Sequence, residues 1–448
     1  MGNGLDTIFK AYDVRGVYPD EIDEDVARRV GNAFAVFTSA ERMVVARDMR
    51  PSSVPLSAAF IEGATLAGAS VVDAGLASTD LIYFAAGRLD APGAMFTASH
   101  NPAQYNGIKL CRAGAAPVGQ DTGLNQIKAA VAEGRLERAA TPGTVTQQDL
   151  VGDFADHVRS FVDVDSLRPM TVVADTANGM GGLVVPRVFD GLPFDLTILF
   201  PELDGTFPNH PADPIQAENL LDLQAAIREK QADVGLAFDG DADRVFLVDD
   251  EAQPLSGSLT TSIVAKGILA DHPGETVVHN LICSRAVPDI IREMGGTPVR
   301  TRVGHSFIKA VMAETGAIFG GEHSGHYYFR DNWRADSGII AALVVLAQLA
   351  KAGVTLSELR KPFERYAASG EINTKVADQK ASMEKVAAAY PDAPKDTLDG
   401  LSVDAGDFWF NVRPSNTEPL LRLNLEANDA ETCARATDEV LALIRGEA

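Results

Sequence analysis

Short runs of β-branched and apolar residues alternate with longer helical stretches through most of the chain, and this order constrains the fold more than any other feature. Residues 170–175, for example, read Met-Thr-Val-Val-Ala-Asp, and a glycine-rich turn at 178–182 follows them. Strands that alternate with helices in this way are typical of α/β layers built on mainly parallel sheets. Because 448 residues exceed the size of one ordinary hydrophobic core, we expect several such layers.

The alternation recurs in three successive units of similar size, and a different pattern follows them. After a predicted helix at 335–352, residues 408–412 and 420–425 read as neighbouring strands, and residues 430–444 read as an amphipathic closing helix. The sequence therefore predicts three similar α/β domains with mainly parallel mixed sheets and a smaller C-terminal α+β domain. The predicted domains cover residues 1–153, 154–254, 255–367 and 368–448.

The formal net charge of −23 repels nucleic acid phosphates and anionic lipid, so we expect neither as a partner. A phosphate-binding site in such a chain must concentrate Arg, Lys, metal and backbone N–H groups locally. The three cysteines are odd in number and far apart, which fits neither a disulfide framework nor a zinc cluster. The first residues lack the pattern of a signal peptide, and the apolar run at 339–349 is too short to span a membrane. We expect a cytoplasmic protein that is a monomer or homodimer.

The first motif, Thr97-Ala98-Ser99-His100-Asn101-Pro102, follows the apolar run at 94–96. A hydroxyl at the end of a strand is well placed to act as a nucleophile, because loop N–H groups can stabilise charge on a phosphoryl group. The same residue types also make ordinary turns. A Ser–His hydrolase dyad is a third reading, but the glycines of a nucleophile elbow are missing.

The second motif, Asp239-Gly240-Asp241-Ala242-Asp243-Arg244, follows the apolar run at 234–238. Three carboxylates so close together repel one another, and Mg²⁺, which prefers oxygen ligands, would offset that repulsion. A calcium EF-hand also begins Asp-x-Asp-x-Asp, but it needs glycine where Arg244 stands. A solvated acidic turn stays open.

The third motif, residues 321–326, reads Gly-Glu-His-Ser-Gly-His and offers groups suited to hydrogen-bonding sugar hydroxyls. His323 and His326 could instead bind zinc, although no third ligand follows at a suitable spacing, and an ordinary surface loop is also open. The fourth motif, residues 413–418, reads Arg-Pro-Ser-Asn-Thr-Glu and could cradle a phosphate or form a simple β-turn. Each motif follows an apparent strand, one in each predicted domain, so we expect four domains to face one central cleft.

These four loops, in this order and spacing, resemble the α-D-phosphohexomutase superfamily over essentially the whole chain. Residues 8–16 are similar to the N-terminal signature of that family, and residues 47–50 to the arginine-containing loop that follows it. His323 and residues 207–210 are more similar to the phosphomannomutase and dual phosphomannomutase/phosphoglucomutase branch than to the phosphoglucosamine branch. Residues 280–285 depart from members that have a ligand-contacting lysine there.

The resemblance implies a magnesium-dependent phosphoserine mechanism. Phosphorylated Ser99 would give its phosphate to the sugar, and the resulting hexose 1,6-bisphosphate would turn end for end before Ser99 retrieves the other phosphate. The implied metal ligands are Asp239, Asp241, Asp243 and a phosphate oxygen on Ser99. The implied catalytic residues are Ser99, Arg15, His100, Lys109 and Arg244, with Arg15 and Lys109 as candidates for proton transfer. The implied substrate-binding residues are Tyr12, His305, Glu322, Ser324, His326, Arg413, Ser415, Asn416 and Thr417.

The expected function is phosphomannomutase activity between mannose 6-phosphate and mannose 1-phosphate, with glucose phosphates open as further substrates. Phosphoglucomutase and phosphoglucosamine mutase stay as alternatives, because one sugar substituent discriminates strongly only where a site is built to bind it. A magnesium-dependent sugar phosphatase would use the same serine and aspartates but admit water to the phosphoenzyme. A non-catalytic sugar-phosphate-binding protein is the remaining alternative.

Overall fold

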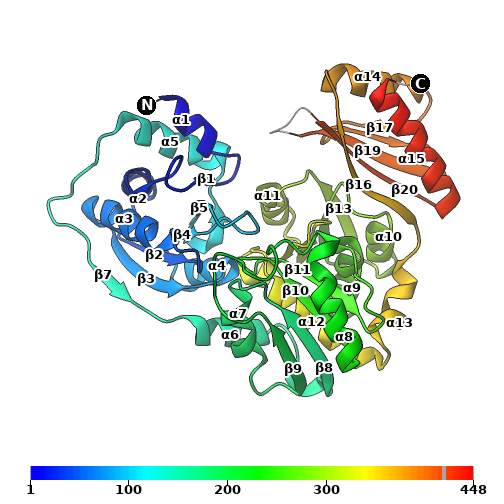
Figure 1. Cartoon of the computed structure of the whole chain (residues 1–448), viewed down its shortest axis with the longest axis horizontal. Coiled ribbons are helices and arrows are strands. Elements are labelled where there is room, and N and C mark those ends of the chain that lie inside the picture. The colour runs from blue at the N-terminus through cyan, green and yellow to red at the C-terminus, as the bar shows by residue number, and fades with distance from the viewer. Residues whose placement is uncertain (1, 416–419, 447–448) are drawn as a thin grey trace.

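The computed structural model describes residues 2–415 and 420–446 and arranges them as four sheets in chain order, each packed with helices (Figure 1). The first three sheets are mixed, with parallel strands at their centres, and the fourth is antiparallel. The predicted fold class is confirmed: three similar α/β units precede a smaller α+β unit.

The first sheet has the strand order β1-β5-β4-β2-β3-β7, with the short β6 beside β5. The strands β4, β2, β3 and β7 are parallel, with β7 at the edge, whereas β5 runs antiparallel to both β4 and β1. The strands are β1 (Val14–Val17), β2 (Arg42–Arg47), β3 (Ser70–Leu76), β4 (Gly93–Phe96), β5 (Tyr105–Arg112), β6 (Ala116–Pro117) and β7 (Val145–Gln147). The helices of this part of the chain are α1 (Gly2–Ile8), α2 (Glu24–Thr38), α3 (Ser53–Leu66), α4 (Thr79–Arg88), α5 (Leu124–Glu133) and α6 (Val151–Arg159).

The second and third sheets repeat one plan, in which three parallel strands carry one antiparallel edge strand. The second sheet contains β8 (Met170–Asp175), β9 (Phe194–Leu199), β10 (Val234–Phe238) and β11 (Val245–Asp249), with helices α7 (Gly181–Phe189) and α8 (Leu221–Lys230). The third contains β12 (Thr276–Asn280), β13 (Thr297–Thr301), β14 (Phe319–Gly321) and β15 (Tyr327–Phe329). Its helices are α9 (Gly257–Asp271), α10 (Ala286–Glu293), α11 (His305–Thr315), α12 (Gly338–Ala352) and α13 (Leu356–Arg360).

The fourth sheet is antiparallel, with the order β16-β20-β19-β18-β17. Its strands are β16 (Ala367–Lys375), β17 (Lys395–Asp396), β18 (Leu401–Asp404), β19 (Phe408–Pro414) and β20 (Leu420–Ala427). Its helices are α14 (Gln379–Ala389) and α15 (Ala430–Arg445). The predicted neighbouring strands and closing helix are therefore confirmed.

All four motifs lie where one strand turns into an antiparallel partner: β4 into β5, β10 into β11, β14 into β15, and β19 into β20. The prediction that each motif follows a strand is confirmed, and in each case the next element is a second strand. The hydrophobic pattern does not predict β5, because polar Asn106 and Lys109 interrupt its buried run. These hairpins place the described motif residues at the ends of the four sheets.

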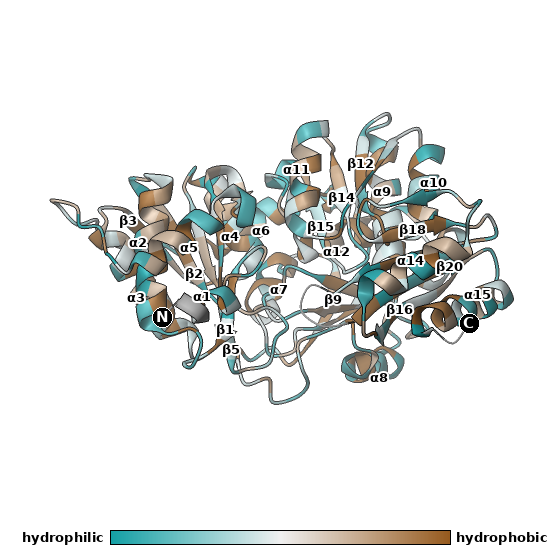
Figure 2. Cartoon of the chain, turned by 90° about the horizontal axis from the view of Figure 1, so that it is seen from above, coloured by the Kyte–Doolittle hydropathy of each residue, from teal (hydrophilic) through white to brown (hydrophobic). Residues whose placement is uncertain are grey.

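The C-terminal unit does not share a hydrophobic core with the other three units. One continuous core contains buried residues of β2, β8, β12 and α12 and so joins the first three units. The C-terminal unit has its own core between its sheet and helices α14 and α15. In Figure 2, helices such as α8 and α15 carry both teal and brown residues, as expected for helices with one face on a core. The C-terminal unit is thus attached to the rest without sharing its core.

Within the described ranges, no single helix has both the length and the apolar composition needed to cross a membrane; one sharply bent pair, 338–352 with 356–363, meets these criteria only jointly.

Candidate active site

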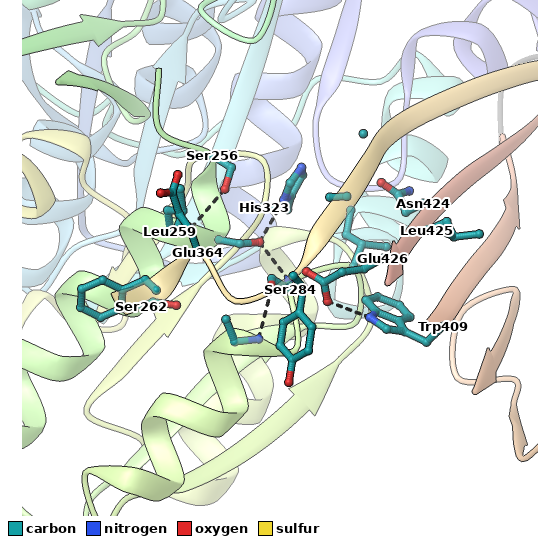
Figure 3. A pocket seen from close by; sticks show the side chains of 17 residues that line it. Ser256, Leu259, Ser262, Ser284, His323, Glu364, Trp409, Asn424, Leu425 and Glu426 are labelled. Atoms are coloured by element: carbon teal, nitrogen blue, oxygen red, sulfur yellow. Dashed lines mark hydrogen bonds between the residues drawn. The ribbon is translucent and has the colours of Figure 1, made fainter. Parts of the chain in front are cut away.

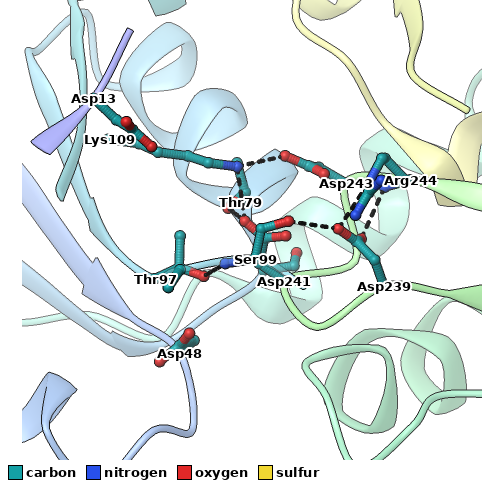
Figure 4. Close-up of polar contacts among 12 residues, drawn as sticks. Asp13, Asp48, Thr79, Thr97, Ser99, Lys109, Asp239, Asp241, Asp243 and Arg244 are labelled. Atoms are coloured by element: carbon teal, nitrogen blue, oxygen red, sulfur yellow. Dashed lines mark hydrogen bonds and ion pairs between the residues drawn. The ribbon is translucent and has the colours of Figure 1, made fainter. Parts of the chain in front are cut away.

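Ser99 lies in the β4–β5 turn and faces the acidic loop of the second unit (Figure 4). Its Oγ donates a hydrogen bond to Asp239 Oδ2 at 2.7 Å, and its N–H donates to Thr97 Oγ1 at 2.9 Å. A Cβ on Gly240 would come within 2.5 Å of the Ser99 carbonyl oxygen, so the close approach of the two loops requires glycine there. Ser99 itself has a left-handed φ of 50°, which is uncommon for a serine and has to be held by its surroundings.

Arg50 holds the serine loop in place, and its side chain is fully buried. Every N–H of its guanidinium is used. Nε donates to Asp48 Oδ2 at 3.1 Å, and the two terminal nitrogens donate to four loop carbonyls: those of Ser99 (2.8 Å), Asn101 (2.7 Å), Pro102 (2.8 Å) and Tyr105 (3.0 Å). Arg50 was not among the predicted site residues. The arginine-containing motif at 47–50 was its only sequence signal.

The three aspartates of the second motif gather with their carboxylate oxygens within 4.8 Å of one another. All three side chains are buried. Among the described residues, Oδ1 of Asp241 and Oδ1 of Asp243 are buried without a hydrogen-bond partner. Buried carboxylate oxygens left free at the centre of an acidic cluster fit a divalent cation such as Mg²⁺.

Two cations of this chain partly neutralise the aspartates. Lys109 Nζ lies 2.8 Å from Asp241 Oδ2 and 2.7 Å from Asp243 Oδ2, and Arg244 Nε lies 2.9 Å from Asp239 Oδ2. Burial raises the pKa of Asp239 to about 8, against the opposing effect of Arg244. Burial alone would also raise the pKa of Asp241, but Lys109 overcomes it and leaves that pKa below its ordinary value. The cluster thus holds more negative charge than its two cations can fully stabilise.

His100 lies beside Ser99, and the residue is exposed. Desolvation by the neighbouring loops and the positive charges of Arg244 and Arg15 lower the pKa of His100, which favours the neutral imidazole. Its Nδ1 lies 2.7 Å from Arg244 Nη2 and 3.3 Å from Ser99 Oγ. Because arginine can only donate, Nδ1 is the acceptor and the ring proton lies on Nε2. Arg15 donates to Asn101 Oδ1 at 2.6 Å, so the predicted catalytic residues all gather around the serine loop.

The third motif lies against the second. His326 Nε2 lies 3.9 Å from Asp243 Oδ1, and its Nδ1 lies 3.0 Å from Ser324 Oγ. Both oxygens of Glu322 accept hydrogen bonds inside the third unit: Tyr328 OH donates to Oε1, and Asn280 Nδ2 and the Gly304 N–H donate to Oε2, each at 3.2 Å. Glu322 is therefore fixed in place by its own unit.

The described residues do not support the hypothesis that His323 and His326 bind zinc together. His323 Nδ1 lies 3.0 Å from Ser258 Oγ (Figure 3), and His323 belongs to neither cluster of metal-ligating groups among the described residues. The metal-ligating groups that gather with His326 are Asp243 and Asp336.

The first and third units also meet at Tyr12 and His305. Their rings make an edge contact with centroids 4.8 Å apart, and a Cβ on Gly304 would lie 2.8 Å from the Tyr12 hydroxyl. Burial lowers the pKa of His305 to about 3, so this imidazole is neutral as well.

The fourth motif lies at the end of β19. The Ser415 N–H donates to the Leu420 carbonyl at 3.0 Å, and Gln379 Nε2 donates to the same carbonyl at 2.9 Å. These contacts fix the two ends of the loop. The predicted substrate-binding residues Asn416 and Thr417 lie outside the described residues.

Residues 207–210 are the segment whose resemblance favoured the phosphomannomutase branch of the family. This segment packs against Arg50, which holds the serine loop. The Arg50 guanidinium lies 5.1 Å from the centre of the Phe207 ring, and His210 Nε2 lies 3.0 Å from Asp175 Oδ2. The segment therefore supports the residues that hold Ser99.

Comparison with known families matches all four parts of the chain. The models described as phosphoglucomutase/phosphomannomutase alpha/beta/alpha domains I, II and III match residues 6–138, 152–253 and 256–366. The model of the C-terminal domain of the same family matches residues 371–443.

Similar proteins cover the whole chain. "Phosphohexose mutases" of Xanthomonas campestris is 40% identical over 443 residues, which are 98% of this chain and 99% of that protein. "Phosphomannomutase" of Escherichia coli is 38% identical over 452 residues, with 98% and 99% covered.

Solved structures share the fold. A phosphoglucomutase/phosphomannomutase family protein from Burkholderia thailandensis has a TM-score of 0.89 and 32% identity, covering 98% of this chain and 97% of its own. N-acetylphosphoglucosamine mutase of Aspergillus fumigatus, solved in complex with GlcNAc-6P and magnesium, has a TM-score of 0.62 and 15% identity, covering 98% and 95%. The chain therefore belongs to the phosphoglucomutase/phosphomannomutase family and is a phosphohexomutase, an isomerase that transfers phosphate within a sugar phosphate.

Proposed function

We propose that this phosphohexomutase is a phosphomannomutase that interconverts mannose 6-phosphate and mannose 1-phosphate through a phosphorylated Ser99 and a hexose 1,6-bisphosphate, and that it also accepts glucose phosphates. One observation carries the proposal: the Ser99 hydroxyl lies 2.7 Å from Asp239 within a buried cluster of three aspartates. The name of the Escherichia coli relative supports mannose as the preferred sugar.

The serine loop carries the phosphate in this mechanism. Phosphorylated Ser99 transfers its phosphoryl group to the free hydroxyl of a hexose monophosphate, and unphosphorylated Ser99 later takes back the phosphate from the other end of the bisphosphate. Arg50 holds the loop in one conformation, so the nucleophile needs no reorganisation during transfer. Arg15 and Lys109 are the groups we propose to assist proton transfer with the sugar hydroxyl.

Asp239, Asp241 and Asp243 would hold Mg²⁺ together with an oxygen of the phosphorylated serine. When bound, Mg²⁺ supplies positive charge that stabilises the charge on the transferring group. Lys109 and Arg244 stabilise the remaining negative charge of the aspartates, and Arg244 also fixes His100 as a neutral acceptor beside the serine. The magnesium in the Aspergillus complex supports this assignment for a protein of the same fold.

The substrate would lie between the third and fourth motifs and the serine loop. Glu322, Ser324 and His326 are proposed to bind the sugar hydroxyls, and Tyr12 and His305 are proposed as further substrate-binding residues. Arg413, Ser415, Asn416 and Thr417 are proposed to hold the phosphate that is not reacting. The four domain ranges, the cytoplasmic location, the monomeric or dimeric state, and the absence of nucleic-acid and membrane partners stay predictions.

The decisive experiment is ³¹P NMR of the purified protein with Mg²⁺, a trace of hexose 1,6-bisphosphate and one sugar 1-phosphate in each tube: mannose, glucose or glucosamine. We expect mannose 1-phosphate to become the 6-phosphate with little free phosphate, and glucose 1-phosphate to follow. Conversion of glucosamine 1-phosphate alone would contradict the proposal, and steady release of inorganic phosphate would favour a phosphatase.

A further inference from the structure

Residues 200–210, here called the support segment, follow β9 in the second unit and lie against Arg50 of the first. A Cβ on Gly205 would come within 2.5 Å of the Arg50 Cα, so the two backbones approach more closely than a larger residue would permit. The Arg50 guanidinium lies over the Phe207 ring, 5.1 Å from its centre. Because Arg50 binds the Ser99 carbonyl, the serine loop depends on how the support segment is held.

The support segment has a backbone conformation that its neighbours must maintain. Phe200 and Phe207 have left-handed φ values of 53° and 52°, which are uncommon for aromatic residues. Asn178, in the turn after β8, binds the middle of the segment. Its Nδ2 donates to the Glu202 carbonyl at 2.9 Å, and its Oδ1 accepts from Asn209 Nδ2 at 2.8 Å.

His210 fastens the end of the support segment with both of its ring nitrogens. Nε2 lies 3.0 Å from Oδ2 of Asp175, the last residue of β8, and Nδ1 lies 2.9 Å from the Pro211 carbonyl oxygen. A carbonyl can only accept, so Nδ1 carries a proton, and an ionised carboxylate likewise only accepts, so Nε2 carries one too. The other carboxylate oxygen of Asp175 accepts from the Ala177 N–H at 2.9 Å, which fixes its orientation. Both bonds of the ring therefore exist together only while the imidazole is protonated.

The charged groups that act on this imidazole are acidic. Desolvation is the largest single effect and lowers the pKa of His210, but Asp175 of β8, the Pro211 carbonyl and Asp222 in the first turn of α8 raise it. Their combined effect is larger, so the pKa of His210 lies above its ordinary value. From the end of β9, Phe200 presents only an uncharged ring, 5.4 Å from the imidazole centre. The side chains of His210 and Asp175 are 13% and 2% exposed, so solvent screens their interaction only weakly.

We propose that His210 is a positioning residue for phosphoryl transfer, because its protonated ring, bound to Asp175, holds the support segment against Arg50 and so keeps the Ser99 loop in place. The inference rests on the proposed role of Ser99 as the carrier of the phosphate. Deprotonation leaves Nε2 without a hydrogen toward the Asp175 carboxylate, so one of the two bonds is lost. The pair is complete at low pH and is lost as pH rises through the raised pKa of His210.

The test compares the pH dependence of kcat between the full-length wild type and Asp175→Asn. The amide that replaces the carboxylate can donate to Nε2 of a neutral imidazole, so both bonds of the ring persist without the extra proton. As pH rises from about 6.5 to 9, kcat of the wild type should fall about tenfold relative to that of Asp175→Asn. The ratio of the two KM values should stay constant, because His210 acts on the serine loop and not on substrate contacts. Titration of the substrate affects both proteins equally and cancels in these ratios.

Two further measurements support the comparison. His210→Gln can keep only one of the two bonds and should lower kcat about tenfold at low pH, with KM nearly unchanged. His272→Gln, at the exposed C-terminal end of α9, is the matched control and should change neither constant. NMR of the wild type labelled with ¹⁵N-histidine needs no turnover, and the imidazole signal that shifts in Asp175→Asn should titrate above about pH 6.5.

Two results would overturn the inference. If that imidazole titrated at or below its ordinary pKa, His210 would not be held in its protonated form. If the ratio of kcat values stayed constant over the pH range, protonation of His210 would not affect the serine loop. A protein with no mutase turnover in which His210 still titrates above its ordinary pKa would refute the proposed function and leave the protonated His210–Asp175 pair standing.

Discussion

At the scale of single residues, the conformation of Ser99 depends on the side chain that holds its loop. A left-handed serine backbone is costly, and the structure maintains it with a buried guanidinium that binds four carbonyls of the same loop. The hydroxyl is thereby fixed against Asp239, which comes from another unit of the chain. The nucleophile and its support are separate groups, so they can be tested separately.

Replacing Ser99 with alanine should lower turnover on the order of a thousandfold or more, because it removes the group that carries the phosphate. Binding of hexose phosphate should persist, since the arginines of the fourth sheet are untouched. A coupled assay and calorimetry measure the two effects. Ser166→Ala, which removes an exposed turn hydroxyl, is the control, and turnover near the wild-type rate in Ser99→Ala would refute the phosphoserine mechanism.

Replacing Arg50 with lysine should lower the free energy of unfolding by about 3 kcal/mol, because buried carbonyls lose their donors. Turnover should fall as well, since the serine loop would no longer be held. Chemical denaturation and kcat provide the two readouts. Arg42→Lys removes a single exposed contact to the Leu89 carbonyl and should leave both nearly unchanged. A stable Arg50→Lys protein with normal kcat would show that the loop holds itself.

At the scale of elements, two helices from different units are joined through one buried carboxylate. Asp80, in the first turn of α4, accepts hydrogen bonds from Ser78 and from Ser337, which is the N-cap of α12. Its second oxygen lies 2.6 Å from Ser337 Oγ. Burial raises the pKa of Asp80 to about 7, and Asp243 and Asp336 act in the same direction. The junction of the first and third units therefore depends on pH.

The sign of that dependence follows from proton binding. Between about pH 4 and 7 the folded protein keeps a proton on Asp80 that the unfolded chain has lost, so this group makes stability fall as pH rises. Asp80→Asn stays neutral throughout and should gain about 3 kcal/mol over the wild type as pH rises across this range. Urea denaturation at several pH values measures the difference. Asp153→Asn, an exposed first-turn aspartate of α6, should show no such trend, and a pH-independent difference for Asp80→Asn would contradict the assignment.

At the scale of the whole molecule, the C-terminal unit is attached by polar contacts. Arg285 Nη2 lies 2.7 Å from Asp404 Oδ1, and the Arg285 N–H donates to Glu426 Oε2 at 2.9 Å. The hydrophobic core of this unit does not join the core shared by the other three. Polar interfaces with separate cores allow rigid-body motion between domains.

Binding of a hexose phosphate should therefore rotate the C-terminal unit and close the cleft. Small-angle scattering of Ser99→Ala with saturating mannose 1-phosphate should give a smaller radius of gyration than the ligand-free protein. The same titration with mannose, which lacks the phosphate, is the control and should give no compaction. Identical profiles with and without mannose 1-phosphate would show that the cleft is already closed.

The sequence predicted most of the strands and helices and all four motifs, because these depend on local patterns. The apolar run at 234–238 matches β10, and the predicted closing helix at 430–444 matches α15. The strand β5 escaped prediction because Asn106 and Lys109 serve the site and interrupt the buried pattern.

Hydrophobic periodicity and turn chemistry act over a few residues, so they can be recognised in the sequence alone. The fold class, the order of the units and the four motif loops could therefore be predicted without the structure. Only the tertiary structure decided which loops touch. The bond from Ser99 to Asp239 spans 140 positions, and the contact of Lys109 with Asp241 spans 132. The four bonds from the Arg50 guanidinium to backbone carbonyls and the ion pair of Arg413 with Glu371 also join residues that are far apart in the chain. Such contacts depend on how whole units pack against one another, and no local pattern in the chain encodes that packing.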